Sequence, residues 1–222
     1  MRNVIVTFAK GNPRYIAAAK AQKQSLIAKG YTGEYICYTS EKQLGCPNHK
    51  DNPYAFKAYA IKKAFDEGYD NILWLDSVVQ CVAPLDKLFE HIQDTGYAFF
   101  DNYTYAIGSY CNDSCKSIYS ITEMELQAPM IMACVMGLNR DKAKDFIDQY
   151  YEGALNGSFV GSWDDHRHDQ TVASLLINRN NIAILQGHET FFMYYFMVGL
   201  EFEYNNQLIK LDRGADVCLL SI

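Results

Sequence analysis

The sequence lacks an apolar run long enough to cross a membrane, and it is poor in positive charge. Its longest strongly apolar run, residues 190–200, falls well short of the about 18 residues that a transmembrane helix needs. The formal net charge of −6 argues against a protein whose main partner is a nucleic acid. No signal-peptide pattern opens the sequence, so we expect a cytoplasmic protein without a transmembrane segment.

The sequence also lacks the cysteine pattern that is typical of disulfide-bonded or zinc-binding proteins. The seven cysteines are an odd number, and most lie within apolar segments, which is typical of reduced thiols in a cytoplasm. Cys111 and Cys115 have a spacing that could hold a metal, but no second Cys/His pair of finger-like spacing accompanies them. The sequence therefore argues against a structural zinc site. The 17 tyrosines and 12 phenylalanines are many, and they fit either a packed core or a ligand cleft.

Strand-like runs alternate with amphipathic helical stretches, which predicts a single α/β domain over residues 1–222. Residues 40–52 contain Gly45, Pro47 and Asn48 and are interpreted as a loop. Residues 101–127 show no strong periodicity and are interpreted as a loop, either a lid or a binding loop, or as a misread element. The tail, including residues 207–211, could add one edge strand. The predicted strands cover residues 3–8, 34–39, 71–75, 97–100, 129–138 and 182–185, and the predicted helices follow near residues 13–30, 54–65, 85–91, 139–154 and 171–177.

The strand around residues 71–75 is the one on which the functional interpretation depends. Its run Ile72–Leu75 is apolar at every position, as in a strand that is buried on both faces, and Asp76 ends it. In open α/β sheets ligands bind beyond the carboxyl ends of the strands, so Asp76 is expected to face a ligand. Asp76 could equally cap a turn. Lys57 lies at the edge of the apolar stripe of the preceding helix, from which its amine could reach the sheet edge or remain solvated.

The most polar cluster of the chain is S-W-D-D-H-R-H-D-Q, residues 162–170, directly before an apolar helix. Polar residues at a helix N-terminus favour a site for an anionic ligand, although a capping and solvated segment is the alternative. His188 follows the predicted strand at residues 182–185. It is a candidate ligand, or a structural or merely exposed histidine.

Three stretches together resemble the GT-A glycosyltransferases, in particular family 8 and related uncharacterised families. They are V-I-V-T-F-A in the first strand, the long stretch F-K-A-Y-A-I-K-K-A-F-D-E-G-Y-D-N-I-L-W-L-D-S-V-V-Q-C-V-A-P-L-D-K-L-F, and H-R-H-D-Q-T-V-A-S-L-L. The resemblance implies a Rossmann-like GT-A domain with a mixed, mostly parallel central sheet flanked by helices. It also implies a hexosyltransferase-like enzyme that moves a sugar from a nucleoside diphosphate, expected to be uridine diphosphate, to an acceptor hydroxyl.

The resemblance also implies roles for individual residues. Thr7, Phe8 and Ala9 would bind the nucleotide base. Asp76 with Ser77 would bind the donor, and Asp76 with His188 a divalent metal. Lys57 or the group His166-Arg167-His168 would neutralise the leaving diphosphate in place of a metal, and Asp169 with Gln170 would meet the donor sugar at the reacting centre. If the reaction inverts the anomeric centre, Asp169 could be the base; if it retains the configuration, that role disappears.

The sequence departs from the family at one informative position. The family motif Asp-x-Asp has two carboxylates, whereas Asp76-Ser77-Val78 supplies one. A hard cation needs several oxygen ligands, so dependence on Mn²⁺ or Mg²⁺ is expected but less secure here. Two rival functions remain. One is a non-catalytic module of GT-A shape that binds a nucleotide sugar or a glycan. The other is a sugar nucleotidyltransferase, for which residues 9–13 are a poor match to the glycine-rich phosphate loop. The sequence leaves the acceptor open between a glycan, a lipid, a protein and a modified base.

Overall fold

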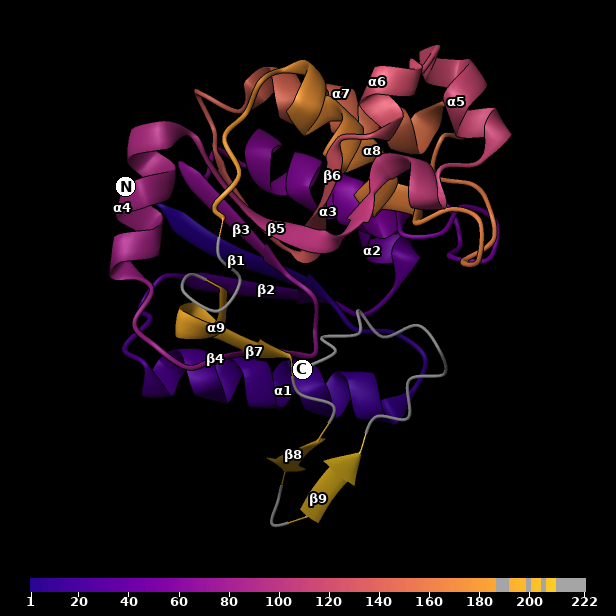
Figure 1. Ribbon diagram of the computed structural model, residues 1–222. Helices are drawn as coiled ribbons and strands as arrows, with labels where there is room; N and C mark the ends of the chain where they lie inside the picture. Colours follow the sequence, from indigo (N-terminus) through magenta and orange to yellow (C-terminus); the bar gives the residue numbers. More distant parts are fainter. Residues whose placement is uncertain (187–191, 199–200, 205–206, 211–222) are drawn as a thin grey trace.

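The computed structural model describes residues 1–186, 192–198, 201–204 and 207–210, and it shows a β-sheet between two layers of helices (Figure 1). The five-stranded sheet has the order β2-β1-β3-β6-β5. Its strands are β1 (Asn3–Phe8), β2 (Glu34–Tyr38), β3 (Asn71–Leu75), β5 (Tyr97–Ala106) and β6 (Pro129–Asn139). β1 is parallel to β2 and β3, whereas β6 is antiparallel to both β3 and β5. Only β6 therefore runs against the rest of this sheet, and the predicted mixed, mostly parallel sheet is confirmed.

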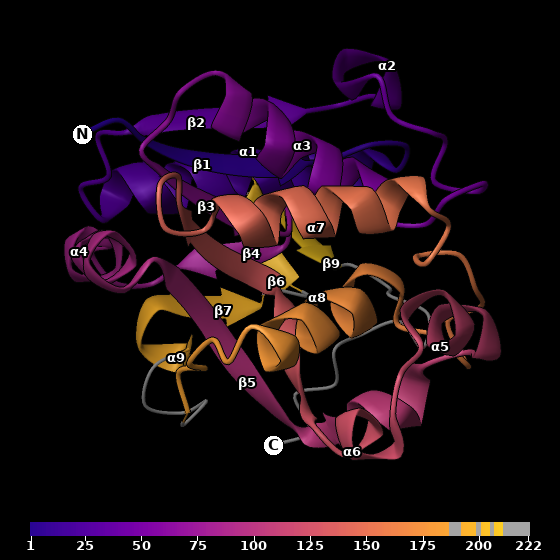
Figure 2. The ribbon, with the colours of Figure 1, turned by 90° about the horizontal axis from the view of Figure 1, so that it is seen from above.

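The helices cover both faces of the sheet. In Figures 1 and 2, α3, α7 and α8 lie over one face, and α1 lies under the other. The helices are α1 (Pro13–Ala28), α2 (Glu41–Leu44), α3 (Ala55–Asp66), α4 (Asp86–Thr95), α5 (Asp113–Tyr119), α6 (Glu123–Leu126), α7 (Lys144–Leu155), α8 (His168–Arg179) and α9 (Phe192–Tyr195), with a 3₁₀ turn at Ile107–Tyr110. Among the described residues, none of these helices has both the length and the apolar character that crossing a bilayer requires.

The period-two alternation of strand side chains explains why the central strands carry apolar residues on both faces. Val4 and Ile72 belong to the core that α3, α7 and α8 cover, whereas Ile5 and Leu73 belong to the core that contains Leu26 of α1. Successive strand residues point to opposite faces of a sheet. A strand that packs against helices on both faces has no solvated side, so every residue of β3 is buried.

The predicted loop at residues 101–127 is wrong. β5 continues to Ala106, and α5 and α6 follow after the 3₁₀ turn. These short helices begin at capping residues: the Asn112 side chain accepts a hydrogen bond from the backbone N–H of Cys115, and Thr122 forms a capping box with Glu125. A helix of one or two turns is too short to show a hydrophobic period. The predicted loop at residues 40–52 likewise contains the single-turn helix α2.

The predicted strand at residues 182–185 is also wrong. Only Leu185 pairs, through an isolated parallel bridge to Phe100 at the edge of β5. The described part of the tail does not extend the central sheet, because β9 (Gln207–Lys210) pairs with β8 (Glu201–Tyr204) in a separate two-stranded sheet. The rest of the predicted edge strand, residues 211 and 217–222, lies outside the described residues. The apolar segment near residue 195 contributes α9 and β7 (Phe196–Val198), and β7 pairs with β4 (Val79–Cys81). Phe196 of this segment is buried in the core.

Candidate active site

Asp76 follows β3 in a turn that hydrogen bonds hold from several sides. Its backbone N–H donates to the carbonyl of Cys134 in β6, at 2.8 Å. The amide of Gln22, which is fully buried in α1, donates to the backbone carbonyls of both Asp76 and Val79, at 2.8 Å each. The indole N–H of Trp74 donates to Asp76 Oδ1 at 2.8 Å. The carboxylate of Asp76 is therefore oriented by a residue of its own strand.

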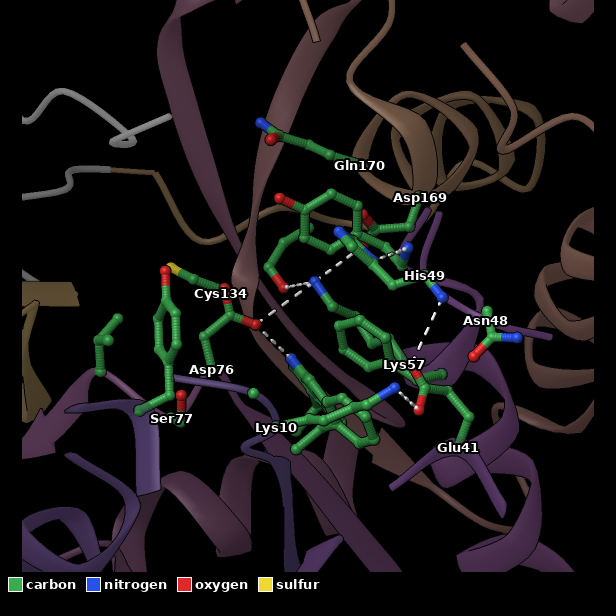
Figure 3. A pocket seen from close by; sticks show the side chains of 18 of the residues that line it. Lys10, Glu41, Asn48, His49, Lys57, Asp76, Ser77, Cys134, Asp169 and Gln170 are labelled. Carbon is green, nitrogen blue, oxygen red and sulfur yellow. Dashed lines mark hydrogen bonds and ion pairs between the residues drawn. The ribbon is translucent and has the colours of Figure 1, made fainter. Parts of the chain in front are cut away.

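Lys57 brings a buried positive charge to this turn from the first part of α3. Its side chain is 3% exposed, and its Nζ lies 2.8 Å from Asp169 Oδ2 and 3.5 Å from Asp76 Oδ1 (Figure 3). The ammonium also donates to the carbonyl of Ala133 in β6, at 2.8 Å. The alternative of a solvated helix lysine is therefore wrong. Lys57 has an oxygen within reach for each of its three protons, and it connects the two acids that lie far apart in the sequence.

Asp169 approaches the same ammonium from the first turn of α8. The phenol of Tyr150 in α7 donates to Asp169 Oδ2 at 3.1 Å, and Asp169 is buried. The neighbouring Gln170 donates its amide N–H to the carbonyl of Ile131, at 2.8 Å, and Ser174 donates to the carbonyl of Gln170 while accepting from the N–H of Ile131. These bonds fix the start of α8 against β6, so the position of Asp169 does not depend on a mobile loop.

Burial and charge act in opposite directions on Lys57. Burial favours the neutral amine, but the negative charges of Asp169 and Asp76 outweigh that effect and raise the pKa of Lys57 above its usual value. Burial, and then the charge of Asp169, raise the pKa of Tyr150 well above that of a free phenol. Both groups therefore keep their protons at neutral pH. Lys57 is a fixed cation and Tyr150 a fixed hydrogen-bond donor.

A cavity of about 780 Å³ opens beside these groups, beyond the carboxyl ends of β1 and β3. Of the residues predicted to form the site, Phe8, Lys57, Asp76, Ser77, Asp169 and Gln170 line it. The structure thus brings Asp76 and Asp169 to one hollow, with Lys57 between them (Figure 3).

The remaining predicted site residues lie elsewhere. Thr7 and Ala9 are buried and are not among the lining residues. His168 is buried behind the cavity, where its Nδ1 lies 2.9 Å from the carbonyl oxygen of Phe159 and its ring stacks on Tyr54. His188 lies outside the described residues.

Aromatic rings form much of the cavity wall. Phe8 stacks on Phe56 with a centroid distance of 4.2 Å, and Tyr54 and Trp163 lie with their centroids 6.0 Å apart. All four rings line the cavity. Sequence analysis did not assign Tyr54 or Trp163 to the site. Trp74 was also missed, although a residue two positions before Asp76 on the same strand could have been expected on the same side of the sheet.

The carboxylate oxygens of Asp76 and Asp169 are not arranged as ligands of a divalent cation. Asp76 Oδ1 already accepts from Trp74 and lies near Lys57, while Asp169 Oδ2 accepts from Lys57 and Tyr150. Val78, in the place of a second carboxylate, is fully buried. In the part of the chain that the structure describes, no group of three or more His, Cys, Asp or Glu side chains could hold a metal ion. Mn²⁺ and Mg²⁺ need several oxygens, and a lysine ammonium occupies the position between the two acids.

Comparison with known proteins shows the fold. No protein-family profile matches the sequence, and no curated protein matches it. The structure is similar to mouse xyloside xylosyltransferase 1, with a TM-score of 0.52 and 10% identity, covering 84% of this chain and 85% of that one. It is also similar to a glycosyltransferase involved in glycosylation of the major capsid of PBCV-1, with a TM-score of 0.51 and 15% identity, covering 84% and 82%.

A third similar structure is the bifunctional glycosyltransferase WbbM, with a TM-score of 0.51 and 12% identity. The match covers 79% of this chain but only 37% of WbbM. All three are glycosyltransferases of the GT-A type. At these identities the likeness establishes the fold alone, and the predicted GT-A fold is confirmed.

Proposed function

We propose that this chain is a glycosyltransferase that moves a sugar from a nucleoside diphosphate, most simply uridine diphosphate, to an acceptor hydroxyl. The observation that carries the proposal is the meeting of Asp76 and Asp169 at one buried ammonium, Lys57, on the floor of the cavity. The GT-A fold supplies the context, because three glycosyltransferases share it. The cavity also lies beyond the carboxyl ends of β1 and β3, where open α/β sheets bind their ligands.

The groups in the cavity suit a transfer reaction that depends on positioning and charge. Of the two acids that contact Lys57, Asp76 is the more accessible, with a side chain 26% exposed against 5% for Asp169, and it would accept hydrogen bonds from donor hydroxyls. Lys57 places fixed positive charge close to the departing diphosphate, and such preorganised charge is often the largest contribution to catalysis. Phe8 would contact the nucleotide base. In an inverting reaction Asp169 would deprotonate the acceptor.

Substitution of the two acids tests this function. A panel of UDP-sugars is assayed for hydrolysis and for transfer to simple sugar acceptors, with Asp76→Asn and Asp169→Asn compared with the wild type. We expect kcat/KM to fall by about 10²-fold or more in both variants, because each loses charge at the reacting centre. Asp66→Asn is the matched control, since Asp66 pairs with a lysine on the outer part of α3. Unchanged turnover in either variant would remove that residue from the site.

One observation favours a second candidate function. Both acids already accept hydrogen bonds from protein groups, so a cavity of this kind could hold a nucleotide sugar or a glycan without turning it over. Calorimetry with the same UDP-sugars, with and without Mn²⁺, separates the two functions. Binding without hydrolysis or transfer on any acceptor would identify a binding module. A gain in affinity with Mn²⁺ would contradict the ligand geometry described above.

A cytoplasmic location stays a prediction. It is supported by the six cysteines of the described residues, none of which forms a disulfide.

A further inference from the structure

The cations that line the cavity differ in how they are paired. Lys10 forms an ion pair with Glu41, and Lys57 pairs with the two acids of the floor. Arg167 also lines the cavity, but within the described residues no carboxylate lies at ion-pair distance from its guanidinium. Lys50 is similarly unpaired there, but it is exposed to solvent, whereas Arg167 is half-buried.

The guanidinium of Arg167 is held between two aromatic rings. Its central carbon lies 4.0 Å from the ring centroid of Tyr110 and 4.0 Å from that of Trp163. The backbone is fixed too, because the N–H of Arg167 donates to the carbonyl of Tyr110 and its own carbonyl accepts from Gln170 at the start of α8. Stacking of this kind orients the planar guanidinium and leaves its N–H groups to other partners.

Two hydrogen-bond donors at this place have no acceptor. Nη1 of Arg167 and Nε1 of Trp163 are buried, and neither has a partner among the described residues. A buried donor without an acceptor is unfavourable by about 1–3 kcal/mol, and more when the donor is charged. Both residues line the cavity, so the cavity is the space in which an acceptor for them can be placed. A half-buried guanidinium without a counter-ion calls for an acceptor that is also negatively charged.

We propose that Arg167, together with the indole N–H of Trp163, binds an oxyanion of the ligand. The inference deepens the proposed function, on which it rests, and it adds a specificity residue at some distance from the acids of the floor. Along the wall, the Trp163 ring lies 6.0 Å from the Tyr54 ring, and the Lys57 amine lies 5.8 Å from that same ring. The oxyanion is either the diphosphate of the donor or an acidic group on an acceptor sugar, since both present paired oxygens to a guanidinium.

Binding measurements on Arg167 variants distinguish these sources. Arg167→Gln removes the charge, Arg167→Lys keeps the charge without the planar fork, and Arg140→Gln is the matched control. Arg140 is exposed and lies over the ring of Phe65, away from the cavity. Each protein is titrated by calorimetry with UDP, uridine, inorganic diphosphate, glucuronate and glucose at two salt concentrations. Thermal unfolding of each variant is measured in parallel, so that a loss of packing is seen separately.

If the oxyanion is the diphosphate of the donor, we expect Arg167→Gln to weaken the binding of UDP and diphosphate by about tenfold or more and to leave the affinity for uridine unchanged. If the oxyanion is an acidic group on the acceptor sugar, we expect the same loss of affinity for glucuronate and an unchanged affinity for UDP. In either case the affinity of Arg167→Lys for the oxyanion should lie between those of the wild type and Arg167→Gln. The loss of affinity should be larger at low salt. Equal binding of every oxyanion by Arg167→Gln and Arg140→Gln would overturn the inference, as would a wild type that binds none of them.

The inference and the proposed function fail in different ways. UDP that binds no more tightly than uridine in any of the proteins, together with glucuronate binding that does not depend on Arg167, would overturn the inference but leave a nucleoside site in place. Binding of glucuronate or diphosphate that depends on Arg167, with no affinity for UDP-sugars and no turnover of them, would support the inference and overturn the proposed function.

Discussion

Lys57 is the residue on which the charges of the cavity floor depend. Lys57 is 2% exposed, and its ammonium lies between the carboxylates of Asp76 and Asp169. These three residues together carry one formal negative charge rather than two. A buried ion pair adds little to stability when it is complete, because desolvation offsets the attraction. Removal of one member leaves the other charges buried without compensation. The loss of Lys57 should therefore reduce the free energy of unfolding by much more than the complete ion-pair network contributes to it.

We expect Lys57→Met to reduce the free energy of unfolding by about 3–5 kcal/mol at pH 7. Asp169 would then keep only the phenol of Tyr150 among its present partners. The double variant Lys57→Met, Asp169→Asn should recover a large part of that loss, because the unpaired charge is removed together with its partner. Urea unfolding of the wild type, the two single variants and the double variant forms a double-mutant cycle.

The pH dependence of the Lys57 contribution has a definite sign. The pKa of Lys57 is raised in the folded state, so its contribution is present below the ordinary lysine value of about 10.4 and is lost only as pH rises through the higher folded value. The difference between the wild type and Lys57→Met should therefore not shrink between pH 7 and pH 9. Additive losses in the cycle, or a difference that disappears by pH 9, would show that the ion pair is not the source of the effect.

Single residues also show where sequence reasoning works and where it ends. The position of Lys57 at the edge of a helical stripe indicated that its amine could reach the sheet edge, and the structure confirms this. Gln22 and Tyr150 gave no such signal. Gln22 supports the Asp76 turn from α1 and Tyr150 donates to Asp169 from α7. Such contacts depend on how elements pack, which no local pattern in one sequence specifies.

Among the elements, the long apolar ones were predictable and the short capped ones were not. β3 is buried on both faces, so its sequence carries a continuous signal. α6 has four residues and no buried one, and its stability depends on contacts with the rest of the chain. Arg179, the last residue of α8, donates to both carboxylate oxygens of Glu125, at 2.6 and 3.3 Å, and to the carbonyl of Tyr119. This contact attaches the α5–α6 region to the helix that carries Asp169.

The attachment predicts an acid-sensitive difference in stability. The hydrogen bond from Arg179 lowers the pKa of Glu125 to about 2. The contribution of Glu125 is then complete above the unfolded value of about 4.3 and is lost as pH falls towards 2. We expect Glu125→Gln to destabilise the protein by about 1 kcal/mol at pH 7, since the pair is partly exposed, and by progressively less below pH 4. Urea unfolding at several pH values measures this.

Glu123→Gln is the control for that experiment. Glu123 lies in the same short helix but is exposed, and it is not a partner of Arg179. Its substitution removes the same charge from α6 without touching the contact with α8. Should both variants lose equal stability at pH 7, the effect would come from helix charge rather than from the bidentate pair.

At the scale of the whole molecule, the cavity is assembled from parts that are distant in the sequence. Phe8 is the last residue of β1, and Asp76 directly follows β3. Lys57 lies in α3, and Asp169 lies in the first turn of α8. The place of Asp76 was predictable, because the apolar run of β3 stops at this acid and ligands bind beyond the carboxyl ends of such strands. The hydrogen bonds that Asp76, Lys57 and Gln170 donate to carbonyls of β6 could not be predicted, because the antiparallel register of β6 is a tertiary property.

This assembly predicts that ligand binding stabilises the entire fold. A ligand that contacts β1, β3, α3 and α8 at once binds only the folded chain, so UDP at about 100 times its Kd should add about 2.7 kcal/mol, or about 5–10 °C in Tm. Phe8→Ala should reduce the shift, since Phe8 lines the cavity on the stacked pair with Phe56. Tyr194→Ala, which removes a 59% exposed aromatic residue outside the cavity, should not. Differential scanning fluorimetry over a UDP series measures both. A shift that is equal in all three proteins would place the nucleotide away from β1, and no shift at millimolar UDP would argue against a uridine-linked donor.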